Sequence, residues 1–551
     1  MATIFTAGQI HTMATHRPTA EAVRVDDGRI ICVGTLDECA SWGPAEVDRR
    51  FDGLVLLPGM IEAHSHSLEG ALSGLPHVGY YPRPRPDGRV DPGLKSYDEI
   101  LDRLRAAQRD LGPDEPLLAV GLDPIFFPHE ARLDRRHLDQ VSTTRPIAVL
   151  HASLHLMAVN TAMLELCGID ADDPTPGIQR DASGQPTGEL HESRAMSRVG
   201  PAMGAVVAAI SSPTGLVDFA RLCRNAGVTT VAEMAGPLLT NPAALEPALA
   251  VTAEASFPAR LVYYNWPCAP GTTCDWEDAA ERAVALSSRS TDKLRIGGIK
   301  LIADGSIQGG TACLCQPGYY LLEDHAQAQL TAEELSAAVG AFHRRDLQVA
   351  CHTNGDEATE AFIEAVDAAL RTHSWLDHRH AAQHVQLATA AQFRRMARLG
   401  MAANIFTNHL WYWGDQHHDQ TVGPERANRM WACRSAIDLG ISATYHADGG
   451  VTPTGQLHTA WCAVNRLTPS GRILGAAEAV TVAEALRAVT VEAAYQLHLD
   501  HELGSIEAGK RADFTVLEAD PFEVDPLALR EVPVWGTVLG GLAYPAERAP
   551  A

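Results

Sequence analysis

Two histidines, His64 and His66, lie two residues apart in the segment PGMIEAHSHS. If the segment is a β-strand, side chains two residues apart point to the same side, so both imidazoles would face one cavity. Imidazole is a suitable ligand for divalent zinc, iron or manganese. The chain has 24 histidines, however, and two ordinary polar residues in a loop explain the pair equally well.

Lys300 lies inside the apolar segment RIGGIKLIADGS, in a chain with only four lysines. Burial disfavours the charged ammonium and lowers its pKa. A neutral amine can react with CO₂ to form a carbamate, an anion whose two oxygens can bridge two cations. The alternative is that Lys300 forms an ion pair with a buried carboxylate such as that of Asp304.

Three more polar residues end or follow strand-like segments. His352 ends LQVACH, His384 ends AAQH, and Asp448 comes soon after ISATY. Each alone fits a capping histidine, a surface histidine or a turn aspartate. With His64, His66 and Lys300 they place six polar side chains at the ends of successive predicted strands. Core packing gives no reason for this recurrence, whereas a metal site does.

The elements that would position these residues alternate between strands and helices. Strands are expected at 228–233, 259–266, 294–302, 347–352 and 381–385, with helices at 219–226, 332–345, 356–372, 390–399 and 481–494. Repeated strand–helix units require a parallel sheet, and their number favours an α/β fold built on a (β/α)₈ barrel. Active sites of such barrels lie at the carboxyl ends of the strands.

The two ends of the chain look different from its middle. Residues 1–57 and 500–551 read as short strands separated by turns, so we expect them to form one small β-domain together. The barrel is then assigned to residues 58–499. A stretch within about 70–215 is rich in Pro, Gly and Arg, and we expect it to be an irregular insertion.

Composition excludes several classes of protein. The chain has 551 residues with 68 acidic and 44 basic side chains, a formal charge of −24. Such a surface repels phosphate and anionic lipid, so we expect no nucleic-acid and no membrane partner. The N-terminus lacks the features of a signal peptide. Eleven cysteines without a repeating spacing predict reduced thiols and a cytoplasmic protein.

Taken together, the motifs resemble the amidohydrolase superfamily, in the branch of YtcJ-like proteins and N-substituted formamide deformylases. The similarity runs from about residue 50 to 522. The matching segments are PGMIEAHSH, RPIAVLHASLHLMAVNTAML, RIGGIKLIADGSIQGGTA, CHTNGDEA, RHAAQHVQL, ATYHADGG and LGSIEAGKRADFTVLEADPF.

The resemblance implies a distorted (β/α)₈ TIM barrel, a β-sandwich built from both termini, and a site for one or two divalent metals, with zinc expected. Carried over to this chain, His64 and His66 hold the more buried metal and Lys300 bridges as N6-carboxylysine. His352 and His384 hold the second metal. Asp448 binds the first metal and shuttles the proton. A homodimer is also possible by resemblance.

The chain departs from the branch beside these residues. The usual Ser-Asp-x-Pro reads Ala447-Asp448-Gly449-Gly450, the usual Glu before the fourth histidine is Gln383, and the Asp that usually precedes the HxH motif is Glu62. The ligands are kept, but their surroundings change, which leaves the substrate open.

The predicted function is that of an amidohydrolase, a hydrolase of carbon–nitrogen bonds other than peptide bonds. Its small-molecule substrate would be a neutral, partly apolar amide or formamide. Hydroxide activated by the metal would attack the carbonyl carbon, with Asp448 as general acid/base. The alternatives are a heterocycle deaminase, an esterase or lactonase on the same scaffold, and a metal-free binding or scaffold protein.

Candidates for substrate contacts are fewer. His155 and Asn160 match a position that the branch keeps near its site, although a polar pair closing an inserted loop fits as well. His409 and His446 could line the mouth of the site, or either could be structural. Trp413 could help to wall an apolar pocket, or pack in the core. Trp413 belongs to the aromatic triplet Trp411–Trp413, which we expect to lie in a loop.

Overall fold

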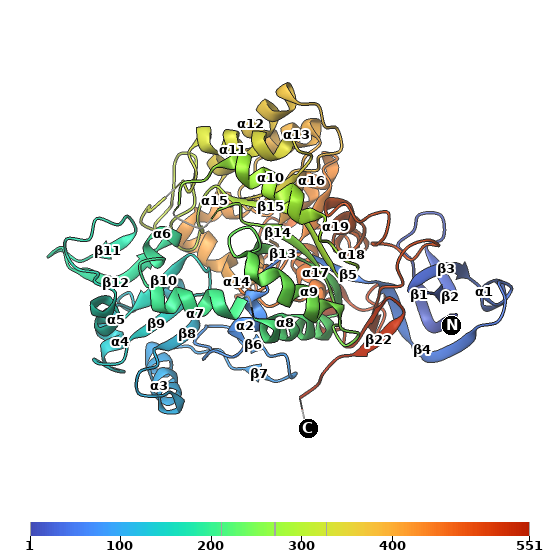
Figure 1. The fold of residues 1–551 in the computed structure, drawn as a ribbon, viewed down its shortest axis with the longest axis horizontal. Coiled ribbons are helices and arrows are strands. Elements are labelled where there is room, and N and C mark those ends of the chain that lie inside the picture. The colour runs from blue at the N-terminus through green and yellow to red at the C-terminus, as the bar shows by residue number, and fades with distance from the viewer. Residues whose placement is uncertain (1, 211, 269–271, 327, 550–551) are drawn as a thin grey trace.

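A computed structural model describes residues 2–210, 212–268, 272–326 and 328–549 (Figure 1). At its centre, eight parallel strands form a nearly closed barrel in the order β19-β18-β17-β16-β15-β14-β13-β5. The strands are β5 (Met60–Ser65), β13 (Val228–Gly236), β14 (Arg260–Asn265), β15 (Leu294–Ile302), β16 (Gln348–Thr353), β17 (Ala381–His384), β18 (Ala402–Ile405) and β19 (Ala443–Tyr445). The predicted α/β barrel is confirmed.

The barrel is closed at its carboxyl edge between its first and last strands. Ser65 at the end of β5 forms a parallel bridge with Gly449, which follows β19. The buried carboxylate of Glu62 accepts hydrogen bonds from the backbone N–H of His64 (3.0 Å) and of Ala447 (2.9 Å). One carboxylate therefore ties the start and the end of the barrel together.

Amphipathic helices cover the outside of the barrel because parallel neighbours need crossover connections. Four of them, α10 (Trp276–Ser287), α11 (Ala332–His343), α12 (Asp356–Thr372) and α13 (Ala390–Leu399), lie together at the top of Figure 1. On α12, Phe362, Ile363 and Val366 are fully buried, and Asp356 and Glu357 begin the helix, where acidic residues complement the helix dipole.

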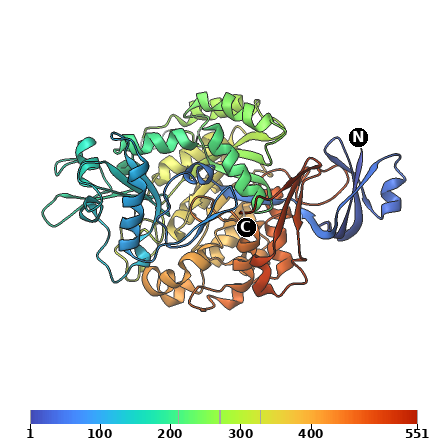
Figure 2. The same cartoon turned by 90° about the horizontal axis from the view of Figure 1, so that it is seen from below.

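A seven-stranded sheet joins the two ends of the chain (Figure 2). It contains β1 (Thr3–His11), β2 (Thr19–Asp26), β3 (Arg29–Gly34) and β4 (Glu46–Pro58), followed by β20 (Phe514–Leu517), β21 (Val534–Leu539) and β22 (Leu542–Pro545). The long strand β4 pairs with both β1 and β20. Only Gly59 separates β4 from barrel strand β5, so this sheet is connected directly to the barrel.

The segment between β5 and β13 folds more regularly than its composition suggested. It contains a sheet of five strands, β8 (Leu117–Leu122), β9 (Ile147–His151), β10 (Leu156–Val159), β11 (Ile178–Arg180) and β12 (Pro186–His191), at the left of Figure 1. The apolar runs IAVLH and LMAV form its buried strands β9 and β10. Helices α6 (Glu192–Met196), α7 (Gly200–Ile210) and α8 (Pro213–Asn225) then lead back to the barrel.

The loop predicted for the aromatic triplet Trp411–Trp413 is wrong. These residues lie in helix α14 (His409–Gln416), where the rings of His409 and Trp413 are 4.3 Å apart between centroids. Residues four apart meet on one face of a helix, and this buried contact outweighs the weak helix propensity of aromatic residues. Sequence reasoning failed here because tertiary packing decides the element.

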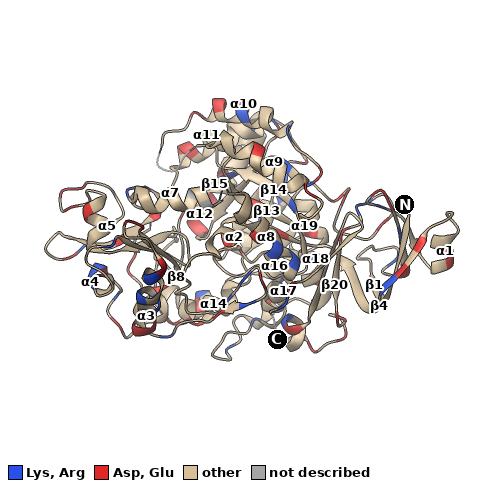
Figure 3. Cartoon of the chain, turned by 60° about the horizontal axis from the view of Figure 1, so that its bottom comes forward, with Lys and Arg blue, Asp and Glu red and all other residues tan. Residues whose placement is uncertain are grey.

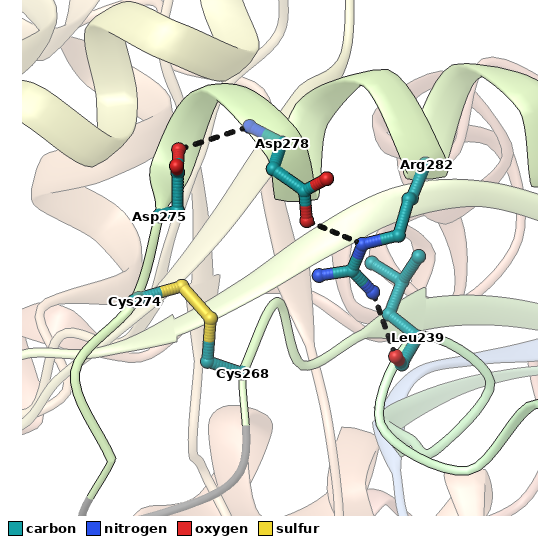
Figure 4. The surroundings of a disulfide bond; sticks show 6 residues. All are labelled: Leu239, Cys268, Cys274, Asp275, Asp278 and Arg282. Atoms are coloured by element: carbon teal, nitrogen blue, oxygen red, sulfur yellow. Dashed lines mark hydrogen bonds and ion pairs between the residues drawn. A yellow bond between two sulfur atoms is a disulfide. The ribbon is translucent and has the colours of Figure 1, made fainter.

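The prediction that the thiols are reduced is wrong for one pair. Cys268 and Cys274 form a disulfide with their Cα atoms 5.6 Å apart, shown in Figure 4, and the other nine cysteines are free. The disulfide directly precedes α10, whose first turn is capped by Asp275 through the backbone N–H of Asp278. It therefore links the segment after β14 to the start of α10.

Acidic and basic residues are interspersed on outer helices such as α3 (Tyr97–Ala107) and α10 (Figure 3). Among the helices in the described part of the chain, none has the length and apolarity needed to cross a bilayer.

Buried histidines cluster at the amino end of the barrel strands. His380 Nδ1 accepts from the backbone N–H of Val349 (3.0 Å), and His380 Nε2 lies 2.8 Å from His343 Nδ1. His378 Nδ1 accepts from the backbone N–H of His380 (2.9 Å), and its Nε2 lies 2.7 Å from the Leu399 carbonyl oxygen. These contacts fit neutral rings. Burial lowers the pKa of His378 to about 4 and lowers that of His380 well below its ordinary value.

This cluster predicts a loss of stability in acid. Unfolded histidines bind protons near pH 6.5, whereas folded His378 does so only near pH 4, so the free energy of unfolding falls as the pH drops between these values. In His378→Asn, the amide oxygen can still accept from His380 but does not titrate. Urea unfolding should show that the substitution removes up to about 3 kcal/mol of this pH dependence. The exposed His16→Asn serves as control, and equal slopes for the wild type and His378→Asn would contradict the prediction.

Candidate metal centre

The carboxyl edge of the barrel brings all six predicted donors to one cavity of about 330 Å³. His64 lies near the end of β5, with His66 just beyond it, and Lys300 lies in β15. The other three come from later strands: His352 from β16, His384 from the end of β17, and Asp448 from the turn after β19. Residues separated by up to 384 positions thus line the same cavity, because the carboxyl ends of all the barrel strands meet at one edge.

The carboxylate of Asp448 lies among the imidazoles. Its Oδ1 is 3.2 Å from His66 Nε2 and 3.6 Å from His64 Nε2, and its Oδ2 is 3.6 Å from His384 Nδ1. Lys300 Nζ is 3.3 Å from His64 Nε2. The rings of His352 and His384 are 4.4 Å apart between centroids. Nitrogen and oxygen donors therefore converge from five strands.

Two of these residues have a backbone conformation that side chains seldom adopt. His384 has φ 71° and Asp448 has φ 57°, in the left-handed region. Such a conformation costs about 1–3 kcal/mol and persists only where the surroundings hold it in place. Its occurrence at two neighbouring donors indicates that the direction in which their side chains point into the cavity matters more than local backbone stability.

A chain of polar side chains orients the imidazoles. Gln383 Oε1 lies 2.7 Å from His64 Nδ1 and accepts from Asn404 Nδ2 (2.9 Å). Asn404 Oδ1 lies 2.8 Å from His446 Nδ1, and His446 Nε2 lies 3.1 Å from His384 Nδ1. Because Gln383 holds Nδ1 of His64, Nε2 of that ring faces the cavity. His446, considered at the mouth or in the core, belongs to this network.

A buried glutamate, Glu233 in β13, lies beside Nδ1 of His66, whereas Asp448 lies beside Nε2. Its Oε1 lies 3.7 Å from His66 Nδ1, and the carboxylate accepts from the backbone N–H of Ser67 and of Ala235. Sequence reasoning missed this residue because VTTVAEMAG carries no motif around the acid. Its one signal is a carboxylate inside an otherwise apolar strand, the same kind of signal that pointed to Lys300.

Burial sets the protonation of the basic groups. It lowers the pKa of Lys300 to about 8, and it lowers the pKa values of His64, His352 and His384 well below the ordinary value. Burial also lowers the pKa of His66, but the neighbouring carboxylates of Asp448 and Glu233 overcome this and raise it to about 9. Neutral imidazoles and a partly neutral amine keep lone pairs that a cation can use.

The donor set fits a divalent metal. His64, His66 and Asp448 each offer one atom within 4.8 Å of the others, as do His64, His384 and His446. His384 Nε2 and Asp448 Oδ1 are buried and have no hydrogen-bond partner among the described residues. Buried polar atoms are normally paired, so these two are available as ligands. Imidazole and carboxylate suit zinc, iron or manganese.

The alternative of a Lys300–Asp304 ion pair is not what the structure describes. Asp304 accepts from the backbone N–H groups of Cys313 (3.0 Å), Asn354 (2.9 Å) and Gly355 (2.8 Å). Its carboxylate therefore holds two loops together, and Lys300 Nζ contacts His64 instead.

The predicted substrate contacts separate into two groups. His155 lines the same cavity as the six donors. Trp413 lines a different, smaller cavity and donates from Nε1 to Asp123 (2.9 Å).

His409 is buried, with Nδ1 3.0 Å from His417 Nε2. Asn160 caps helix α5 (Thr161–Leu166) and bonds the backbone of its own sheet, the structural role that was left open.

A family model described as "Amidohydrolase family" matches residues 51–542, nearly the whole chain. The chain belongs to the amidohydrolase family. The resemblance drawn from the motifs is thereby confirmed, together with the assignment of the protein as an amidohydrolase.

Two named relatives of this amidohydrolase are similar over almost their full length. The N-substituted formamide deformylase of Arthrobacter pascens is 27% identical, over 97% of this chain and 96% of its own. The putative amidohydrolase YtcJ of Bacillus subtilis is 26% identical, over 98% and 99%. Among solved structures, an uncharacterized metal-dependent hydrolase of Pyrococcus horikoshii has a TM-score of 0.70 at 20% identity, covering 96% of this chain and 99% of its own. At that identity it shows the fold.

The orientation of His64 by Gln383 predicts an effect on metal affinity. In Gln383→Leu the His64 ring loses its partner at Nδ1, and we expect affinity for zinc, measured by competition with a chelating dye, to fall about 10–100-fold. Gln496→Leu is the matched control, since buried Gln496 accepts from Thr444 Oγ1 (2.6 Å) and does not line the cavity. The prediction fails if both variants bind zinc alike.

Proposed function

We propose that this amidohydrolase cleaves the C–N bond of a neutral, partly apolar amide or formamide. The observation that carries the proposal is the convergence of four imidazoles, one carboxylate and a buried lysine on one cavity at the carboxyl edge of the barrel. The similarity to an enzyme named N-substituted formamide deformylase supports this bond type over others.

We assign the metal as zinc, one or two ions per chain. His64, His66 and Asp448 would hold the more buried ion, with His352 and His384 at a second. Lys300 would bridge them as a carbamate, since burial already lowers its pKa to about 8 and makes the neutral amine accessible. When bound, a divalent cation lowers the pKa of water and polarises a carbonyl group.

The proton transfer of the reaction is assigned to Asp448. Asp448 takes the proton of the attacking water and delivers it to the nitrogen as the C–N bond breaks, so that an acid and an amine are released. Burial raises the pKa of Asp448, but the neighbouring His66, His446 and Lys300 outweigh this and keep it below the ordinary value. The ionised carboxylate is the form that can accept a proton.

The wall of the cavity supports a neutral substrate with an apolar substituent. Its apolar lining includes Leu150, Leu154, Met196, Met203, Trp266 and Ile302. Lys300 is the only lysine or arginine among the described residues that line this cavity. Apart from Lys300 the wall therefore offers no lysine or arginine to an anionic group, whereas an alkyl or aryl group would be removed from water.

The reaction is tested by a screen with purified, zinc-loaded protein. Formanilide, acetanilide, a lactam and a lactone separate formamide, acyl amide, cyclic amide and ester cleavage, and an aminopyrimidine tests deamination. We expect the formamide to be cleaved, and Asp448→Asn to be slower by about 10²–10⁴-fold. Ammonia released from the aminopyrimidine alone, or no turnover of any compound, would contradict the proposal.

The carbamate predicts a chemical rescue. Lys300→Ala should lose zinc and activity, and short carboxylic acids such as acetate or propionate should restore part of both, because they supply two oxygens where the carbamate would stand. Lys293→Ala is the matched control, since Lys293 Nζ donates to the carbonyl oxygens of Glu254 and Phe257 and does not line the cavity. Normal zinc content and turnover in Lys300→Ala would refute the bridge.

A further inference from the structure

A histidine–glutamate pair faces the metal centre from the inserted segment. His155, in the turn between β9 and β10, has Nδ1 2.8 Å from Glu192 Oε2. The two residues are also joined through their backbones, since Glu192 N–H donates to the carbonyl oxygen of His155 (2.7 Å). His155 lines the main cavity, whereas Glu192 lies behind it and is 2% exposed.

Glu192 shares an unusual backbone with the predicted metal donors. Its φ is 65°, in the same left-handed region as His384 and Asp448. A non-glycine residue keeps this conformation only where other contacts hold it. Glu192 directly follows β12, and its left-handed conformation turns the carboxylate towards His155.

The second oxygen of Glu192 is buried without a hydrogen-bond partner among the described residues. It lies so close to Gly305 that a Cβ at this glycine would be 2.3 Å from it. The carbonyl oxygen of the same Gly305 lies 3.2 Å from His352 Nε2. Because residue 305 is glycine, the Glu192 carboxylate can lie against the same backbone segment that contacts His352, a predicted metal ligand.

The contact with Glu192 fixes the orientation of the His155 ring, so that Nε2 is the nitrogen that faces the cavity. An ionised carboxylate only accepts hydrogen bonds, so Nδ1 carries the hydrogen and Nε2 is left for another partner. His155 is the one imidazole among the described lining residues that is not among the six donors, and its ring centroid is 5.1 Å from that of His352. A substrate at the metal centre would come within reach of Nε2.

We propose that His155 contacts the reacting amide group through Nε2, and that Glu192 is the positioning residue that holds His155 for this contact. The inference rests on the proposed function, because it takes the amide as the bound group. The competing role is purely structural, with the pair serving only to fasten the turn at 151–156 to the end of β12.

Two substitutions of His155 separate these roles. Asparagine places its amide where histidine has Nδ1, so His155→Asn keeps the bond to Glu192 but loses the reach of Nε2. Glutamine places its amide near Nε2, so His155→Gln keeps the reach and weakens the bond to Glu192. We expect kcat/KM for formanilide to fall about tenfold or more in His155→Asn and less in His155→Gln. A structural role predicts the reverse order.

Glu192→Ala and the double variant with His155→Asn test the positioning. If Glu192 acts through His155, the double variant should be no worse than His155→Asn alone, with zinc content unchanged throughout. His137→Asn is the matched control: His137 Nδ1 is 2.8 Å from Asp134 Oδ1, in a pair that lines none of the described cavities. Additive losses, or loss of zinc, would overturn the proposal.

The contact with His155 can be tested separately from the hydrolysis. For this, the binding of formanilide to the zinc-loaded Asp448→Asn protein is measured by calorimetry, with and without His155→Asn. Weaker binding after His155→Asn, combined with no turnover in the wild type, would leave the contact standing and reject the hydrolysis. Turnover in the wild type with unchanged kinetics and binding in His155→Asn would reject the contact and leave the hydrolysis standing. Absence of both turnover and binding would reject both.

Discussion

The constraint on which this structure depends is the cost of burying ionisable groups close together. Lys300, His64 and Asp448 are each at most 4% exposed and lie within 3.6 Å of a neighbour in the same cluster. Removing charges from water is expensive unless each finds a partner. The protein meets this cost by keeping His64 neutral, by lowering the pKa of the lysine, and by leaving two buried donor atoms for a cation.

The barrel supplies the rigidity that this arrangement needs. Parallel strands end at one edge, so donors far apart in the chain become neighbours without long loops. Glu62 ties the first strand to the last at this edge, and Gln383 and Asn404 fix ring orientations from β17 and β18. Left-handed backbone at His384 and Asp448 is tolerated because these strands and hydrogen bonds hold it.

The inserted segment contributes what the barrel lacks. The barrel provides the donors, whereas Leu150, Met196 and Met203 of the insertion provide much of the apolar wall, together with His155. The polar donors and much of the apolar wall therefore come from different parts of the chain. Because the two come from different segments, the wall can change while the donors stay.

Strand periodicity and the motifs indicated the barrel and the six polar strand ends by themselves, because which residues end a strand is encoded locally. They did not reveal Glu192 or Glu233, the pairing of Cys268 with Cys274, or the helix at Trp411–Trp413. A lone acid or cysteine has no local signature, and its role depends on what packs against it. Only the tertiary structure brings Glu192 to His155, since distances between remote residues are set by how strands and insertion pack together.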